Sequence, residues 1–228
     1  MGVTAPRNLG WHVGWTLAGF VPYVAVTAVQ LASKFRHDVQ ADHVSKALEM
    51  PTLAFGVGVG VGVAMLLAHR RPRPRVTALL FAGLALSWFG DIFIARLPVG
   101  LGLFFFAHAA YIWMFEVAFH NRLPSRWGLL AIPWFVALLG VLTPRLGGMF
   151  LCFTLYGLIL AAMTVSSTRG NRWTAAGGVL FLLSDSVLSL RLFTRFFRGS
   201  VGSFAIMLSY TAAQAFISVG ILRDKPAT

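Results

Sequence analysis

Windows of about 20 mostly apolar residues recur along this chain, and they constrain its fold more than any other feature of the sequence. An α-helix needs about that many apolar residues to cross the hydrocarbon core of a bilayer. The chain is 57% hydrophobic and only 11% charged, so no stretch between the windows has the composition of a soluble domain. The sequence therefore predicts one integral membrane domain over residues 1–228.

Eight windows are predicted to form membrane-spanning helices. They cover roughly residues 11–32, 48–68, 76–97, 99–119, 128–143, 147–166, 173–193 and 201–222. The predicted fold is an all-α polytopic membrane helical bundle. The first window follows Arg7 as in a signal peptide, but it is long enough to span and shows no small-residue cleavage site, which indicates a retained helix.

The formal net charge of +12 lies mostly in short segments between the windows. This placement suits lipid headgroups, and we therefore exclude nucleic-acid binding. An even number of spans places both termini on one side, which carries eleven of the 19 Lys and Arg residues, many of them in "HRRPRPR" (69–75). The positive-inside rule then predicts cytoplasmic termini. The excess of Arg over Lys favours a bacterial cytoplasmic membrane.

Two segments have an ambiguous pattern. "SKFRHDVQADHVSKALEMP" (33–51), the only long polar connection, fits either a short interfacial helix or a solvated loop. "GVGVGVGV" (56–63) alternates like a strand. Because lipid requires each segment to satisfy its own backbone hydrogen bonds, we predict a closely packed glycine-rich helix there.

The chain contains seven acidic residues. Four of them are predicted to lie near water: Asp38, Asp42, Glu49 and Asp224. Glu116 lies close enough to the polar segment 120–126 to reach the interface. Asp91 and Asp185 remain deep in their windows, where a carboxylate costs several kcal/mol and usually faces the bundle interior or a water-filled cavity. These two residues are the candidate functional acids, although an acid that only bonds a neighbouring helix is the simpler alternative.

Helix geometry places other polar side chains near the same depth. With a rise of about 1.5 Å per residue, Asp91 and Asp185 lie about 10 and 12 Å inside their windows, and His108 and Tyr210 about 15 Å inside theirs. Tyr111 lies one turn deeper than His108. We therefore predict that these side chains share one cavity.

Helical periodicity also predicts which neighbouring residues share a helix face with each acid. Gly83, Ser87 and Asp91 recur every four residues and form a stripe that can approach another helix. Of Ser184 and Ser186, which flank Asp185, only one is expected to face the same way as the acid.

The two acids also suggest an internal repeat. "GDIFIA" and "SDSVLS" contain them, and each segment precedes a window that opens with glycine. Four spans per half would make a parallel 4+4 repeat, in which both acids enter the membrane in the same direction. Chance similarity between apolar segments is the alternative.

The sequence lacks several common catalytic patterns. It has no G-x-S-x-G elbow and no H-E-x-x-H, and its single cysteine, Cys152, cannot form a disulfide or a thiolate cluster within the chain. We expect no metal and no cofactor. Two carboxylates in a low-dielectric cavity are not expected to be ionised together, so one can act as a general acid and the other as a base. The same pair would suit a proton-coupled carrier, and a lipid-binding bundle without turnover is a third interpretation.

Four segments resemble a known family. "GLALSWFGDIFI" (83–94), "GLGLFFFAHAAYI" (100–112) and "GGVLFLLSDSVLSL" (177–190) resemble the G-D, histidine–tyrosine and L-S-D signatures of the YhhN-like lysoplasmalogenase family of multispan membrane proteins. "SKALEMP" (45–51) resembles the region of that family's lysine at the entrance to the second helix, with Ala47 where family members commonly carry proline. The resemblance extends from about Ser45 onward.

The resemblance implies an eight-helix fold with cytoplasmic termini and an activity. The family hydrolyses the vinyl ether bond of lysoplasmalogens, releasing a fatty aldehyde and a glycerophospho-headgroup compound. Asp91 and Asp185 are then the expected catalytic pair. The expected substrate-binding residues are Lys46, His108, Tyr111, Ser184 and Tyr210. Lys46, with the arginines at 191–198, would attract the phosphate, and the partners are a lysophospholipid substrate and the membrane lipids. Oligomeric state is left open, as is which acid holds the proton.

Overall fold

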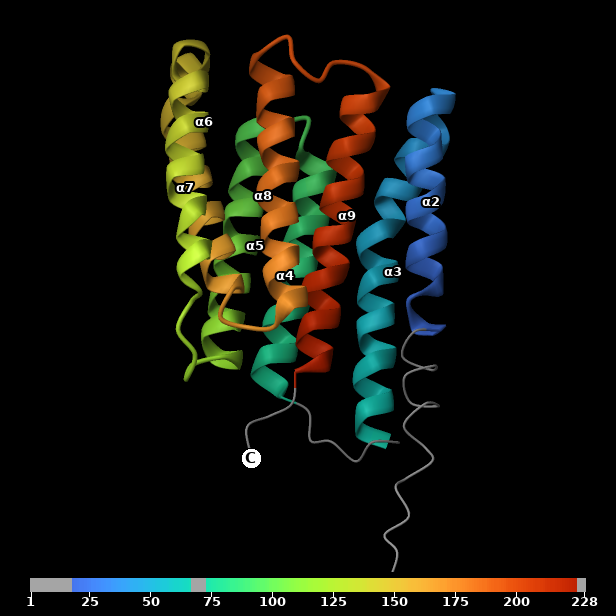
Figure 1. Ribbon diagram of the computed structural model, residues 1–228. Helices are drawn as coiled ribbons and strands as arrows, with labels where there is room; N and C mark the ends of the chain where they lie inside the picture. Colours follow the sequence, from blue (N-terminus) through green and yellow to red (C-terminus); the bar gives the residue numbers. More distant parts are fainter. Residues whose placement is uncertain (1–17, 67–72, 225–228) are drawn as a thin grey trace, which may run out of the picture.

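The computed structural model describes residues 18–66 and 73–224. Its long α-helices are α2 (Val21–Arg36), α3 (Val39–Leu66), α4 (Pro74–Phe93), α5 (Leu97–Ala118), α6 (Ala131–Leu146), α7 (Phe150–Ser167), α8 (Arg172–Phe193) and α9 (Ser200–Arg223), with short 3-10 helices η1 (Arg126–Leu130) and η2 (Gly147–Met149). The long helices run side by side along one axis (Figure 1). Over the described ranges the fold contains no strand, so the predicted all-helical bundle is confirmed.

Each of the eight predicted windows overlaps one of these helices, but within residues 18–66 and 73–224 only six helical segments are long and apolar enough to cross a membrane. Two reasons account for the difference. Helices α6 and α7 follow one another through η2 and form a single apolar segment, Arg126–Ser167. The described part of α2 has only 16 residues. The prediction of a bundle of apolar, membrane-spanning helices is therefore confirmed, whereas the eight-span count and the 4+4 repeat remain predictions.

Local sequence explains where several helices begin. Pro74 and Pro98 lie in the first turns of α4 and α5, where proline's fixed φ fits and its missing N–H is not needed. Asn171 caps α8 because its side chain accepts hydrogen bonds from the backbone N–H groups of Trp173 and Thr174, at 3.0 and 3.2 Å.

The predicted polar connection at 33–51 is wrong in both its forms. Helix α2 continues to Arg36 and α3 already begins at Val39, so the connection is a tight turn and not a separate interfacial helix or loop. His37 ends α2 in the left-handed conformation, with φ of 53°. Asp38 then accepts a 2.9 Å hydrogen bond from the backbone N–H of Ala41 and caps α3. The mixed charges of this segment obscured its helical continuity in the sequence.

The glycine-rich run 56–63 is helical and lies within α3, as predicted. Close packing is achieved at Gly56, where a Cβ atom would lie 2.9 Å from the carbonyl oxygen of Gly19. Gly58 and Gly62 have open space around them. Only one side of this run therefore uses its glycines for close approach between helices.

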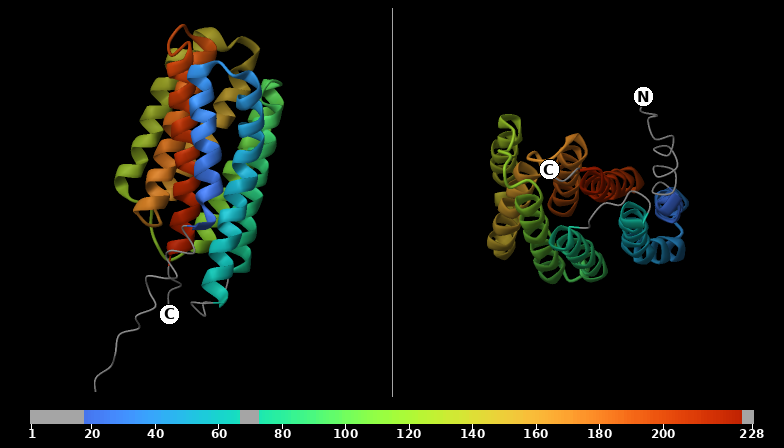
Figure 2. Two further views of the ribbon diagram at one scale, coloured as in Figure 1. Left: turned by 90° about the vertical axis from the view of Figure 1, so that its right-hand side faces the viewer. Right: turned by 90° about the horizontal axis from the view of Figure 1, so that it is seen from below.

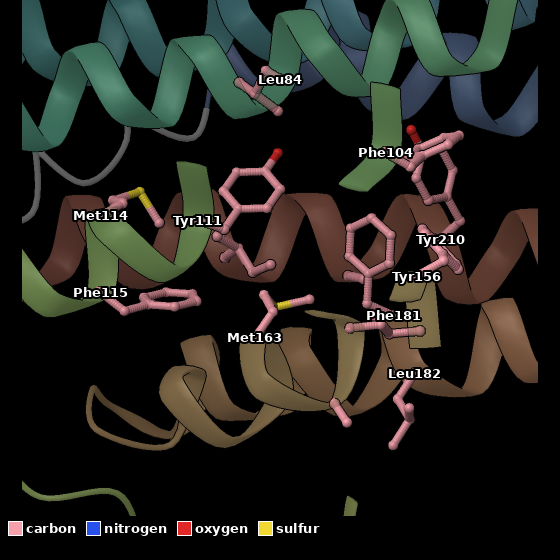
Figure 3. Close-up of a cluster of buried hydrophobic side chains, with 14 of the residues drawn as sticks. Leu84, Phe104, Tyr111, Met114, Phe115, Tyr156, Met163, Phe181, Leu182 and Tyr210 are labelled. Carbon is pink, nitrogen blue, oxygen red and sulfur yellow. The ribbon is translucent and has the colours of Figure 1, made fainter. Parts of the chain in front are cut away.

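The bundle has two edges that matter for the site. Helices α2 and α3 stand at one edge beside α9 and α4, while α6 and α7 stand at the opposite edge (Figures 1 and 2). Aromatic and apolar side chains fill the space between them, among them Leu84, Tyr111, Phe115 and Phe181 (Figure 3). The ring of Tyr111 occupies the place that a side chain at position 83 would take, which explains the glycine there.

The two ends of the bundle are formed by different segments of the chain. The start of α2 and the end of α9 lie at the lower end in Figure 1. At that end Asp224 pairs with Arg73 and Arg122, with N–O distances of 2.9 and 3.5 Å. Several residues used for the orientation prediction (Arg7, Arg70, Arg71 and Lys225) lie outside the described residues, so the cytoplasmic placement of the termini stays a prediction. The α2–α3 turn and the α8–α9 connection lie at the upper end.

Candidate active site

A cavity of about 300 Å³ lies inside the upper half of the bundle and brings the two predicted acids together. Asp91 of α4 and Asp185 of α8 both line it. Lys46, Tyr156 and Tyr210 contribute from α3, α7 and α9. The walls thus come from helices far apart in the sequence, and we call this space the main cavity.

Asp91 is held by groups from two other helices. The Tyr210 hydroxyl donates a 2.7 Å hydrogen bond to its Oδ2 atom, and Nζ of Lys46 lies 3.7 Å from its Oδ1 atom. The indole N–H of Trp88 bonds the carbonyl oxygen of Ala47 at 2.9 Å, which fixes α3 against α4 at this level. A cation and a phenol therefore face the same carboxyl group.

Asp185 has a phenol and an imidazole as neighbours. The Tyr156 hydroxyl donates a hydrogen bond to its Oδ2 atom, and Nε2 of His108 lies 3.3 Å from the same hydroxyl and 3.9 Å from Oδ2. His108 is fully buried and its ring meets Phe181 edge-on, with centroids 4.7 Å apart. Its Nδ1 atom has no hydrogen-bond partner in the described part of the chain. His108 thus stands behind Tyr156 and does not line the main cavity.

Tyr111 is placed away from the main cavity. Its hydroxyl donates a 2.6 Å hydrogen bond to Oε1 of Gln214, and Nε2 of Gln214 donates a 3.0 Å bond to the hydroxyl of Ser87. This chain of side chains joins α5, α9 and α4 in the dry core. The Gly83, Ser87 and Asp91 stripe therefore does approach its neighbours, with Ser87 and Asp91 each bonded to a residue of α9.

The two serines beside Asp185 face different helices. Ser184 lines the main cavity, and its hydroxyl donates a 3.0 Å bond to the carbonyl oxygen of Ile206. Ser186 instead accepts a 3.0 Å bond from the indole N–H of Trp134 on α6. Because the Ser184 hydroxyl is committed to a backbone carbonyl, it lacks the adjacent base that a nucleophilic serine needs.

The main cavity adjoins a second cavity near the α2–α3 turn and the α8–α9 connection. Lys34, Asp42, Arg191 and Ser203 line both the main cavity and a neighbouring one of about 310 Å³. Lys34 pairs with Asp42, and Arg191 donates a hydrogen bond to Ser203. We call these four residues the polar entrance. It presents both charge signs next to each other.

The opposite side of the main cavity is apolar. A narrow cavity of about 30 Å³ shares Phe153, Tyr156, Asp185 and Ser189 with it and continues between α6, α7 and α8. Farther in, the lining consists mostly of apolar side chains: Phe135, Leu138, Leu139, Leu142, Leu160 and Leu182. We call this space the apolar branch. Asp185 stands where the branch meets the main cavity.

Two residues near the site were not anticipated from the sequence. Tyr156, like Tyr210, lies in the middle of a predicted window. Each of the chain's four tyrosines is buried and hydrogen-bonded. Residue type and depth in the window could therefore have identified Tyr156 as a site residue. Glu49 was predicted near water, and this is wrong. It is fully buried, and its carboxyl oxygens have no hydrogen-bond partner among residues 18–66 and 73–224. Helix α3 begins earlier than predicted, which moves Glu49 inside the bundle.

The arrangement is suited to moving protons beside a bound amphiphile. Two carboxyl groups face one cavity, each held by a phenol. One side of the cavity is polar and adjoins a second polar cavity, and the other side is apolar. Such a gradient fits a ligand with a charged head and a hydrocarbon tail.

Comparison with known proteins identifies relatives of this sequence. The sequence model of the YhhN family matches residues 41–221. A lysoplasmalogenase of Mycobacterium tuberculosis is 30% identical over 95% of this chain and 85% of its own length. Lysoplasmalogenase TMEM86B of Homo sapiens is 32% identical over 65% of each chain. No solved structure matches the chain.

Proposed function

The chain belongs to the YhhN family, and from this premise we propose that it hydrolyses the vinyl ether bond of lysoplasmalogens to a fatty aldehyde and a glycerophospho-headgroup compound. The relatives named above are lysoplasmalogenases. The observation that carries the proposal is the pair Asp91 and Asp185 on one cavity that runs from a charged entrance to an apolar branch.

The three parts of a lysoplasmalogen match three parts of this space. The phosphate fits beside Lys46, Lys34 and Arg191, since ammonium and guanidinium groups bind phosphate through charge-assisted hydrogen bonds. An ammonium headgroup fits beside Asp42, which lines both the main cavity and its neighbour. The alkenyl chain points from the linkage towards the apolar branch. The reactive linkage then lies between the two acids.

Paired carboxyl groups supply the chemistry that a vinyl ether requires. One acid donates its proton to the β-carbon, the C=C electrons form the new C–H bond, and the positive charge is shared by the α-carbon and the ether oxygen. The other carboxylate stabilises this oxocarbenium ion and takes a proton from water as the water oxygen bonds to the α-carbon. This division of labour resembles glycoside hydrolysis.

The same two carboxyl groups then assist the breakdown of the hemiacetal. Its hydroxyl proton passes to the carboxylate that began as the acid, while the carboxyl that began as the base protonates the leaving glycerol oxygen. The C–O bond then breaks and an aldehyde and an alcohol remain. One water molecule is consumed, and both carboxyl groups return to their starting states.

The other candidate residues take supporting roles in this proposal. Tyr210 and Tyr156 orient the two carboxyl groups, and Ser184 borders the substrate. His108 acts through Tyr156, and Tyr111 acts through Gln214 on the position of α9. We therefore treat His108 and Tyr111 as positioning residues.

Aldehyde release tests the proposal. Purified protein in detergent or bilayers should convert a lysoplasmalogen to fatty aldehyde, while the matching ester-linked lysophospholipid stays intact. Asp91→Asn and Asp185→Asn should each lose about 10²–10⁴ of the rate, the usual contribution of a general acid or base, with unchanged melting temperatures. Full activity in either variant would remove that residue from the mechanism. Movement of intact substrate with a pH gradient, without aldehyde, would indicate a carrier instead.

A further inference from the structure

The two acids occupy different places between the polar entrance and the apolar branch. Asp91 lies beside Lys46, on the side of the bundle formed by α3. Asp185 lines both the main cavity and the apolar branch, on the side formed by α6 and α7. A ligand whose head lies at the entrance and whose tail points towards the branch therefore meets Asp91 on its head side and Asp185 on its tail side.

A vinyl ether has a matching direction. Its α-carbon is bonded to the ether oxygen, which leads to glycerol and the headgroup, whereas its β-carbon carries the hydrocarbon chain. Protonation takes place at the β-carbon and positive charge develops at the α-carbon. In the substrate placement proposed above, the proton donor must be the acid on the tail side and the cation-stabilising carboxylate must be the acid on the head side.

Asp91 has a cation and a phenol as neighbours. Nζ of Lys46 lies 3.7 Å from its Oδ1 atom, and a nearby cation stabilises the charged form. The Tyr210 hydroxyl also donates to this group. Glu49 of α3 is near enough to interact electrostatically with Asp91, but it makes no hydrogen bond to it among the contacts of the described residues.

No lysine or arginine of the described residues pairs with Asp185, in contrast to Asp91. The Tyr156 hydroxyl from α7 donates a hydrogen bond to Oδ2 of Asp185, and His108 from α5 stands behind that hydroxyl, with Nε2 3.9 Å from Oδ2. The bond from Tyr156 to Oδ2 is the hydrogen bond that Asp185 makes within the described ranges. Oδ1 is thus available to carry a proton towards the cavity.

We propose that Asp185 is the general acid, which protonates the β-carbon, and that Asp91 is the ionised carboxylate, which stabilises the oxocarbenium ion and takes the proton from water. This assignment rests on the proposed function. Two independent observations agree on it: the direction of the cavity and the charge of the neighbouring groups.

Infrared difference spectroscopy of the protein in lipid bilayers at neutral pH tests where the proton lies without requiring turnover. The spectra are recorded in a Glu49→Leu background, so that this buried carboxyl group contributes no band. The carbonyl stretch of a protonated carboxylic acid should then disappear from Asp185→Asn and persist in Asp91→Asn, which should lose only a carboxylate stretch. Glu116→Gln is the matched control, because Glu116 is half-exposed and paired with Arg169 and should also lose only a carboxylate stretch.

The pH dependence of the residual activity provides the second readout, after subtraction of the rate without protein. A general acid must be protonated, so Asp185→Asn should lose the alkaline fall in kcat/KM. A general base must be ionised, so Asp91→Asn should lose the acidic fall. If an acid has only a structural role, its substitution should lower the rate and leave both the acidic and the alkaline fall in kcat/KM in place.

The possible outcomes are distinct. Loss of the protonated band in Asp91→Asn, in both variants or in neither would overturn the assignment, and so would reversed pH limbs. If the wild-type protein releases no aldehyde, the proposed function fails and the acid–base roles fail with it, while the infrared bands still show which carboxyl group holds the proton.

Discussion

The phenolic hydroxyl of Tyr210 on α9 donates a 2.7 Å hydrogen bond to Oδ2 of Asp91 on α4. This contact orients the carboxylate that we place on the head side of the substrate. A hydrogen bond to a charged group contributes about 1.5–3 kcal/mol, which corresponds to about 10- to 100-fold in rate. We predict that Tyr210→Phe lowers kcat by this factor. Tyr23→Phe is the control, because Tyr23 donates to the carbonyl oxygen of Thr211 away from the cavity lining. Equal losses in both variants would contradict the prediction.

The polar entrance should affect binding more than chemistry. Arg191 lies on the cavity wall and its guanidinium bonds only the neutral Ser203 among the side chains of the described residues. We predict that Arg191→Gln raises KM about tenfold, equivalent to about 1.4 kcal/mol, with little change in kcat. Hydrolysis of an alkenylglycerol without phosphate should be unaffected. The control is Arg145→Gln, since Arg145 bonds the carbonyl of Val141 on α6. A fall in kcat with constant KM would argue against a headgroup role.

Headgroup preference should depend on Asp42. This carboxylate pairs with Lys34 at the polar entrance. We predict that Asp42→Asn reduces hydrolysis of an ethanolamine-bearing lysoplasmalogen relative to one with an uncharged glycerol headgroup, measured as the ratio of the two kcat/KM values. An unchanged ratio would show that the ammonium group does not lie beside Asp42.

The apolar branch should determine chain length. Leu142 is buried on its wall, whereas the neighbouring Val141 is exposed on α6. We predict that Leu142→Trp fills the branch and raises KM several-fold for long alkenyl chains but not for short ones. Val141→Trp should leave both substrates unaffected. A chain lying elsewhere would make the two variants behave alike in a comparison of kcat/KM across chain lengths.

Glu49 should limit stability. It is fully buried and its oxygens find no hydrogen-bond partner within the described chain. Burying a polar group without a partner costs about 1–3 kcal/mol, so we predict that Glu49→Leu raises the melting temperature. Asp224→Asn should lower it, because Asp224 pairs with Arg73 and Arg122. Lower stability in Glu49→Leu would show that the carboxyl group is satisfied by water or an ion.

Sequence reasoning identified the helices and the main polar residues because both depend on local patterns. Apolar windows locate helices, and helix rise gives the depth of Asp91 and Asp185. A four-residue period identified the face of α4 that carries Gly83, Ser87 and Asp91. These statements need no knowledge of which helices are neighbours.

The rest depends on tertiary packing. That Tyr156 reaches Asp185, or that Tyr111 points to Gln214 and not to the cavity, is decided by how α7 and α9 pack against α5 and α8. Glu49 was misplaced for a different reason. Its segment has the charge pattern of a loop, but tertiary packing extends α3 back to Val39 and buries this turn.

Aldehyde release in deuterium oxide tests the central claim most directly. Protonation of the β-carbon by an acid that exchanges with solvent predicts a fatty aldehyde with a single deuterium on the carbon next to the carbonyl, measured by mass spectrometry before further exchange. Asp91→Asn and Asp185→Asn, while still folded, should release almost none. Aldehyde without deuterium, undiminished release by either variant, or recovery of only intact lysoplasmalogen from the wild-type protein would contradict the account.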